Sequence, residues 1–285
     1  MTTTIEKLPA KTYKLTITIP KDVVSQAFQK ALTTLTSQVK IDGFRPGTAP
    51  ADLVKDKIDP SKLRGEVVNT LLPQAVSSAI KEHHMAPIIN PRINLKQLED
   101  GKEATFEATI VELPEIVLGD YKKAVSDIQS FNAPRPLTPE RSDGGQAKTP
   151  TKTADITNAL LATSKVDISP TLIEEETTRM FSQLIDQTAK LGMTVEDYLR
   201  SIKKNLEELK AEYKKQAEEN LKLEFILTEI AKVEKIAVSD EEIQSAINAN
   251  PDSKAREELA KEENKWYIRA ILLKNKVLIE LSKGI

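Results

Sequence analysis

The chain has 285 residues, 39% of them hydrophobic and 29% charged, and its formal net charge at pH 7 is −2. This length is enough for two domains, and the nearly balanced charge excludes a global basic field that would bind nucleic acid in bulk. The absence of cysteine excludes disulfides, thiolate metal sites and a cysteine nucleophile, and aromatic residues at only 4% favour aliphatic burial on helices.

Residues 1–118 mix strand and helix patterns. Residues 13–19 and 105–111 alternate apolar and polar side chains with period two, which predicts two half-buried strands. Between them, residues 23–35 and 67–80 carry apolar side chains at three- and four-residue spacing, which predicts two helices. Strands that flank helices without an alternating βαβ pattern predict a small α+β domain with an antiparallel sheet.

Residues 119–164 differ in composition from both neighbours. The stretch FNAPRPLTPERSDGGQAKTPTKT is rich in Pro, Thr, Ser and Gly and almost free of large apolar side chains. Such a segment buries too little surface to offset its ordering entropy, so we predict a flexible linker, with short helical turns at its edges.

Residues 165–285 predict an all-α domain. The first helix opens at Ser169-Pro170 and ends at Gly192, a long helix without Pro or Gly covers 195–233, and a last helix covers 252–281. Capping boxes are predicted at Thr194 with Asp197 and at Ser239 with Glu242. Helices this long in so little chain favour an extended arrangement with partly exposed apolar grooves.

Residues 41–50, IDGFRPGTAP, form a short loop after the first helical pattern. Gly43 and Gly47 permit positive φ and Pro46 stiffens the loop, which leaves Phe44 and Arg45 at its tip. An aromatic ring beside a guanidinium is a common anchor of protein interfaces. From the residues alone, a docking loop and an ordinary loop with Phe44 in the core are equally open.

A strand, a helix and then G-F-R-x-G-x-x-P resemble the ribosome-docking signature of bacterial trigger factors. In the C-terminal half, VDISPTLIEEETTRMFSQL, GMTVEDYLRS and LEFILTEIAKVEKIAVSDEEIQSAI resemble the arm-forming helical domain of the same family. The two blocks stand in the family's order and cover most of the chain outside the linker. Periplasmic chaperones of the SurA type have related arms, but the docking loop and the lack of an apolar signal stretch at the N-terminus argue against that branch.

The chain departs from the family pattern at two places. Pro46 stands where the family has a lysine, which puts the strength of ribosome docking in doubt. Trigger factors carry an FKBP-like prolyl isomerase of about a hundred residues between the two blocks, whereas residues 119–164 offer only Tyr121 and Phe131 for an aromatic pocket. We therefore expect no isomerase domain and no enzymatic activity.

The resemblance implies a cytoplasmic, ATP-independent chaperone without a cofactor. Its α+β N-terminal domain would dock at the exit tunnel of the large ribosomal subunit, and its all-α domain would shield nascent and unfolded polypeptides. The docking residues are Gly43, Phe44, Arg45, Pro46 and Gly47, and the expected client contacts are Phe181, Leu184, Tyr198, Tyr213, Phe225, Trp266 and Tyr267.

Several alternatives remain open at this point. The chain could be a free holdase or assembly factor that no longer uses the ribosome, a residual isomerase, or a helical scaffold for one dedicated partner, and the free protein could be a homodimer. Trp266 could instead be buried in the core of the helical domain. A metal site is not expected, because the adjacent His83 and His84 point about 100° apart on a helix. No Walker loop, GxSxG or dinucleotide fingerprint occurs, and no membrane partner is expected.

Overall fold

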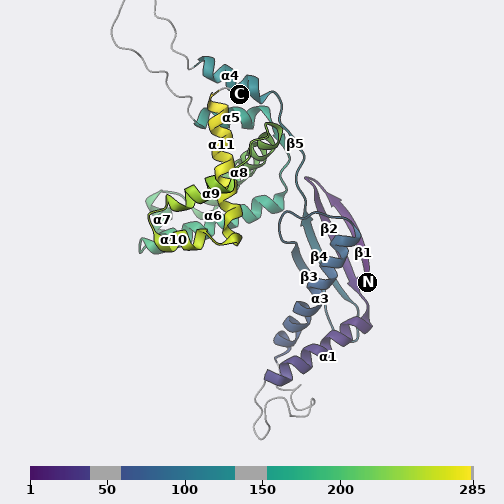
Figure 1. Cartoon of the computed structure of the whole chain (residues 1–285). Coiled ribbons are helices and arrows are strands. Elements are labelled where there is room, and N and C mark those ends of the chain that lie inside the picture. Colours follow the sequence, from purple (N-terminus) through teal and green to yellow (C-terminus); the bar gives the residue numbers. More distant parts are fainter. Residues whose placement is uncertain (39–58, 132–152, 284–285) are drawn as a thin grey trace, which may run out of the picture. The chain divides into compact units, whose positions relative to one another are not determined.

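The computed structural model describes residues 1–38, 59–131 and 153–283, which form two compact units, Met1–Leu113 and Pro114–Ile285 (Figure 1). Side chains are described for the same ranges except near their ends. Each unit is treated by itself below.

Unit 1 is built on a four-stranded antiparallel sheet. Its strand order is β1-β2-β4-β3, with β1 at Thr2–Leu8, β2 at Thr12–Ile19, β3 at Arg92–Gln97 and β4 at Ala104–Val111. Leu15 pairs with Ala108, and Ile17 pairs with Phe106. Because side chains alternate along a strand, these four residues share the buried face. The two strands predicted at 13–19 and 105–111 are confirmed as β2 and β4.

Two helices cover the buried face of this sheet. They are α1 at Lys21–Gln38 and α3 at Pro60–Glu82, which pack on each other. The core they enclose with the sheet includes Val24, Ala27, Val67, Ala79 and Phe106, the last without exposed surface. Both helices were predicted from their apolar spacing, and the α+β class is confirmed.

The edge strands β1 and β3 escaped prediction. All but one of the β1 residues are exposed, and β3 is nearly as open. A strand that is solvated on both faces has no reason to alternate apolar and polar side chains, so the pattern that reveals β2 and β4 is missing from TTTIEKL and RINLKQ.

Unit 2 is mostly helical, which confirms the fold class predicted for the C-terminal half. Its helices are α4 (Tyr121–Phe131), α5 (Thr153–Thr163), α6 (Pro170–Lys190), α7 (Val195–Ser201), α8 (Leu206–Val233), α9 (Asp240–Asn248), α10 (Ser253–Leu259) and α11 (Glu262–Lys283). The short strands β5 (Ile116–Val117) and β6 (Lys165–Val166) pair antiparallel. Helix α8 packs against α5, α6 and α11.

The predicted linker needs correction at both ends. Helices α4 and α5 pack on each other and α5 packs on α8, so these segments are part of unit 2. Val125, Ile156 and Leu160 are buried there. The few apolar residues of this region stand four apart, which is enough to bury one helix face against an existing core. The unit boundary lies at Leu113 and Pro114, and the rest of the predicted linker, 132–152, lies outside the described residues.

The helix predicted at 195–233 is two helices. Helix α7 ends because Lys203 takes a φ of +54°, and the Lys204 N–H donates to the Leu199 carbonyl at 3.1 Å. This is the Schellman arrangement, which usually places glycine at the left-handed position. Asn205 then caps α8 by accepting from the Glu208 N–H at 2.8 Å. A lysine at the left-handed position hid this break from the sequence.

The helix predicted at 252–281 is also interrupted. Helix α10 ends at Leu259 and α11 begins at Glu262. The Asn264 side chain donates to the Glu258 carbonyl at 2.7 Å, so a side chain satisfies a carbonyl that a continuous helix would have bonded internally.

Candidate functional site

The predicted docking residues Gly43, Phe44, Arg45, Pro46 and Gly47 lie outside the described residues. The structure does describe the two helix ends that flank them. The end of α1 and the start of α3 lie close together at one end of the helix pair (Figure 1). Asp59 caps α3 by accepting from the Ser61 N–H at 2.8 Å. The segment is therefore attached at both ends to helices anchored in the core of unit 1.

In unit 2, five of the predicted client contacts lie on α6, α7 and α8, and three of these are Phe181, Tyr198 and Tyr213. Phe181 of α6 and Tyr213 of α8 stack in a tilted arrangement with ring centroids 4.9 Å apart. Burial raises the pKa of Tyr213, and the nearby Tyr198 of α7 and Glu212 raise it further. All three aromatic side chains are half-buried. Their rings join these helices and expose only part of their surface.

Two other predicted contacts differ in burial. Leu184 of α6 has only 5% of its surface exposed and belongs to the core, so its assignment as a client contact needs correction. The apolar spacing on α6 put Leu184 in the same stripe as Phe181 but could not show which of them the neighbouring helix covers. Phe225 of α8 is half-buried.

Trp266 and Tyr267 lie in the second turn of α11 and are open to solvent. Their exposed fractions are 68% and 54%, and their rings meet edge to face with centroids 6.0 Å apart. Large aromatic rings left uncovered by a monomer are typical of interaction sites. The core alternative for Trp266 does not hold.

The exposed surface of α11 extends further than the sequence predicted. Ile271 and Ile279 are 40% and 52% exposed. Ile271 follows Tyr267 by four residues and lies beside it, whereas Ile279 lies three turns further along the helix and is rotated by about 120° from Tyr267. We call Trp266, Tyr267, Ile271 and Ile279 the α11 surface.

The α11 surface begins near charged groups of α6 and α8. A hydrogen bond from Arg179 to Glu176 raises the pKa of Arg179, with smaller contributions from Tyr267 and Glu224. Glu224 also pairs with Lys274 at 2.8 Å. The start of the α11 surface is thus bordered by ion pairs.

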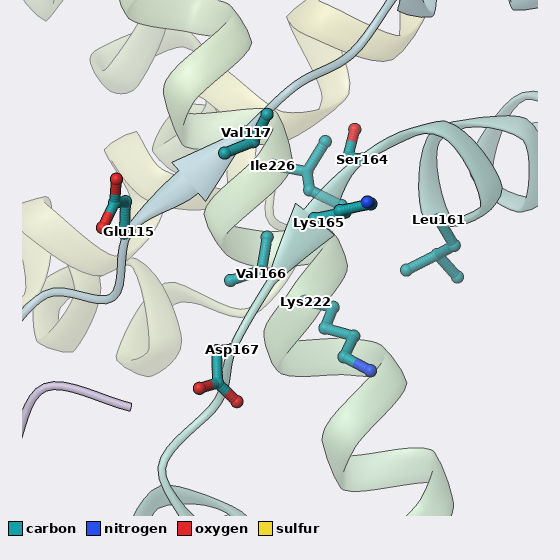
Figure 2. A pocket seen from close by; sticks show the side chains of 9 residues that line it. All are labelled: Glu115, Val117, Leu161, Ser164, Lys165, Val166, Asp167, Lys222 and Ile226. Atoms are coloured by element: carbon teal, nitrogen blue, oxygen red, sulfur yellow. The ribbon is translucent and has the colours of Figure 1, made fainter. Parts of the chain in front are cut away.

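A cleft of about 440 Å³ lies beside the two short strands (Figure 2). The strands are held by the Ser164 hydroxyl, which donates to the Leu118 carbonyl at 2.9 Å. Gly119 has a φ of +60°, and a Cβ there would collide with the Thr163 carbonyl oxygen. The close crossing of the two segments therefore requires glycine.

The cleft combines apolar and charged side chains from α5, α8, β5, β6 and the residues next to these two strands (Figure 2). Val117, Leu161, Val166 and Ile226 supply apolar surface, and Glu115, Lys165, Asp167 and Lys222 supply two charges of each sign. Lys222 is held by Glu218 at 2.6 Å. The cleft can therefore accommodate an apolar side chain with charged groups around it. Among its lining residues the only hydroxyl is that of Ser164, which already donates to the Leu118 carbonyl.

No group of three or more His, Asp or Glu side chains within the described ranges is placed to hold a metal ion. His83 and His84 follow α3, and His84 takes a φ of +51°. Over the same part of the chain, no helix is long and apolar enough to cross a bilayer.

Two family models match the chain in succession. Residues 1–133 match the model of the bacterial trigger factor protein, and residues 145–283 match that of the trigger factor C-terminus. Together they cover nearly all of the chain, in the order that the sequence predicted.

Individual relatives agree with these models. The chain is 37% identical over 122 residues to the trigger factor of Staphylococcus epidermidis and 38% identical over the same length to that of Staphylococcus saprophyticus. Each alignment covers 43% of this chain and 28% of the relative.

A solved structure has the same fold. It comes from work on promiscuous substrate recognition in the folding and assembly activities of the trigger factor chaperone, and it superposes with a TM-score of 0.67 over 99% of both chains at 15% identity. The order of the two family matches, the relatives and the shared fold agree, and the chain belongs to the bacterial trigger factor family.

Proposed function

We propose that this protein is a cytoplasmic chaperone that works without ATP, docks at the exit tunnel of the large ribosomal subunit and shields nascent or unfolded polypeptides. The observation that carries the client-binding part is the α11 surface, whose four large apolar side chains are 40–68% exposed on a helix anchored by buried Ile268, Val277 and Leu281. Family membership makes unfolded polypeptide the first ligand to test.

The physical character of this surface suits weak and general binding. Apolar burial contributes about 25 cal/mol per Å² and has little directional preference, so many different clients can be held and released. Tethering at the ribosome would compensate for low affinity by raising the effective client concentration.

Ribosome docking is assigned to Phe44 and Arg45 by their match to the family's signature. The lysine that follows the arginine in that signature is replaced by Pro46. Lys62 and Arg64, exposed in the first turns of α3, are described cations that follow this segment along the chain. They would support attraction to a ribosomal surface in a salt-dependent way.

We propose no enzymatic activity. The two family matches leave only residues 134–144 between them, far fewer than the roughly one hundred residues of an isomerase domain. An assay of cis–trans isomerisation on a proline-containing peptide tests this directly, and a rate above the uncatalysed one would contradict it.

The decisive experiment is co-sedimentation with 70S ribosomes at physiological salt, comparing the unchanged chain with a Phe44→Ala, Arg45→Ala double variant. We expect the unchanged chain to sediment with ribosomes and the double variant to stay in the supernatant. A Lys190→Ala, Leu191→Ala variant is the matched control, because it also removes a cation and an exposed apolar side chain, here at the end of α6.

The alternative is a free holdase or assembly chaperone, which Pro46 favours because it removes a positive charge from the docking signature. This alternative predicts that the unchanged chain suppresses aggregation of an unfolded protein but does not sediment with ribosomes. Sedimentation that survives the double change would place the ribosome contact elsewhere on the chain. A scaffold for one dedicated partner would fail to protect unrelated unfolded proteins.

A further inference from the structure

The two edge strands of the unit 1 sheet differ in how open they are to pairing. Strand β1 pairs with β2 in unbroken register from Thr2 to Leu8, and no strand among the described residues pairs with its other edge (Figure 1). Strand β3, at the opposite edge, has a register shift between Leu95 and Gln97. Bulges blunt an edge, whereas a regular exposed edge is a template for another extended chain.

A cleft of about 430 Å³ opens beside β1 in unit 1. It is lined by Ile5 and Lys7 of β1, Tyr13 of β2 and residues 83–85 after α3. Ile5 pairs with the buried Leu15, so both Ile5 and Lys7 point to the helix-covered side of the sheet. The cleft exists because α3 ends at Glu82 and the left-handed His84 turns the chain away before it covers β1.

A strand added to the free edge of β1 would place every second side chain on this same side of the sheet. These side chains would lie beside Ile5, which is 42% exposed, and beside the exposed Lys7. The backbone edge and the cleft therefore form one continuous surface for an extended peptide.

Two polar groups of the cleft, the Lys7 ammonium and the Nε2 of His83, lack a partner among the described residues. Lys7 makes no ion pair with any described carboxylate, and the Nε2 of His83 is buried without a hydrogen-bond partner in the described structure. The acid of the cleft, Glu112, is already engaged, since it accepts from the Ala86 N–H at 2.9 Å and interacts with Tyr13. Burial first, then Glu112, raises the pKa of Tyr13. A cation without an ion pair is complementary to a carboxylate.

We propose that β1 binds an extended segment of another polypeptide by strand addition, with an apolar side chain beside Ile5 and a carboxylate side chain two residues away beside Lys7. The choice of a non-native polypeptide as ligand rests on the proposed chaperone function. The site itself is separate from the α11 surface, because it lies in unit 1.

The test uses the full chain and labelled seven-residue peptides measured by fluorescence anisotropy at low salt. The first peptide has leucine and glutamate two positions apart among serines and threonines, and the second replaces the glutamate with lysine. We expect the glutamate peptide to bind about tenfold more tightly, because the lysine peptide would meet a like charge.

The Lys7→Glu variant should reverse this preference. The glutamate peptide should lose about tenfold in affinity, and the lysine peptide should regain it, which also shows that the variant is folded. Lys11→Glu is the control, since it makes the same charge change in the turn after β1 without lining the cleft. Peptides N-methylated at alternate positions distinguish strand addition from other modes of binding. Methylation of the peptide edge that pairs with β1 should abolish binding, and methylation of the opposite peptide edge should leave binding intact.

Three results would overturn the proposal. Equal loss with both methylated peptides, or with neither, would exclude strand addition. An unchanged preference in Lys7→Glu would exclude the carboxylate at this position. A dimer of the unchanged chain that the glutamate peptide dissociates would make a second copy the occupant. A failure of the chaperone proposal would appear separately, as no suppression of aggregation by the unchanged chain.

Discussion

Unit 1 and unit 2 use their apolar side chains in different ways. In unit 1, the sheet and both helices enclose one cluster that includes Leu15, Ile17, Val67 and Phe106, residues far apart in the sequence. In unit 2, a small cluster of Ile243, Ile247 and Ile268 joins α9 and α11. Large apolar side chains remain exposed on α11, and the largest of them, Trp266, has 68% of its surface exposed.

The polar interactions follow the same division. In unit 1, Lys14 and Lys96 approach Glu107 from the two neighbouring strands at 2.9 and 3.0 Å. In unit 2, most described ion pairs join residues three or four apart on one helix, such as Glu218 with Lys222. Capping boxes also begin α7, α8 and α9.

This difference explains how one chain can combine a stable core with exposed apolar surface. A helix stabilised by its own caps and by pairs within one turn depends less on tertiary burial than a strand, whose partners are distant in sequence. Unit 2 can therefore leave an apolar face open for a client, whereas unit 1 needs its core closed.

The largest expected effect tests the closed core. Phe106→Ala should lower the free energy of unfolding of unit 1 by about 3–5 kcal/mol, because the removed ring has no exposed surface and leaves a cavity. Urea unfolding followed separately for the two units, by NMR signals of each, measures it. Phe181→Ala is the matched control in unit 2 and should cost about 1 kcal/mol, since that ring is half-buried. Equal losses of unfolding free energy at the two positions would contradict the difference in burial between the two units.

The next effect tests the open surface of unit 2. Changing Trp266, Tyr267 and Ile271 to Ser should weaken binding of an unfolded client about tenfold, because several exposed apolar side chains are lost together. The temperature at the midpoint of thermal unfolding should be the same for this variant as for the unchanged chain. Aggregation of a chemically denatured protein, followed by light scattering, gives the readout.

The control for this variant changes Glu263 and Asn275, which are exposed polar residues of the same helix, to Ser. It should retain full protection of the client. If the polar variant loses as much protection as the apolar one, the α11 surface is not what holds the client.

The parts of the fold that follow from sequence are those with strong periodicity. Strands β2 and β4 and helix α6 are each buried on one face, so apolar side chains recur in their sequences with the period of a strand or a helix. Caps at Thr194 and Ser239 were also predictable, because a side-chain oxygen followed three residues later by an acid has a local geometric meaning.

Other parts could not be predicted, for identifiable physical reasons. Lys203 and Lys235 take φ values of +54° and +55° at helix ends where glycine would have given a signal. On α11, Ile268 is buried and Ile271 is exposed, although the two are chemically identical. Which of them meets a neighbouring helix is decided by tertiary packing. The docking residues 43–47 lie outside the described residues, so their role stays a prediction.

A smaller effect tests the local stabilisation of unit 2. Asn205→Ala should lower the free energy of unfolding by about 1 kcal/mol, because it leaves the Glu208 N–H of α8 without its side-chain acceptor. Asn205→Asp is the control and should preserve stability, since aspartate caps as well as asparagine. Urea unfolding of unit 2 measures both. A cost above that of Phe106→Ala would mean that α8 nucleates the whole unit and is not stabilised locally.

The smallest effect is a pH dependence at the start of α9. A hydrogen bond from Lys276, followed by the backbone bond from Ser239, holds the pKa of Glu242 below its ordinary value of 4.5. Because the folded pKa is depressed, this contribution to stability is present above the unfolded pKa and is lost as the pH falls through the folded one. Glu242→Gln should therefore be less stable than the unchanged chain at pH 7, and the difference should vanish at a pH below the folded pKa. Glu241→Gln, one residue away in the same helix turn and without a described ion pair, should show a smaller difference at pH 7. Similar pH profiles for the two variants would mean that the general field of the helix end, and not the bonds from Lys276 and Ser239, stabilises α9.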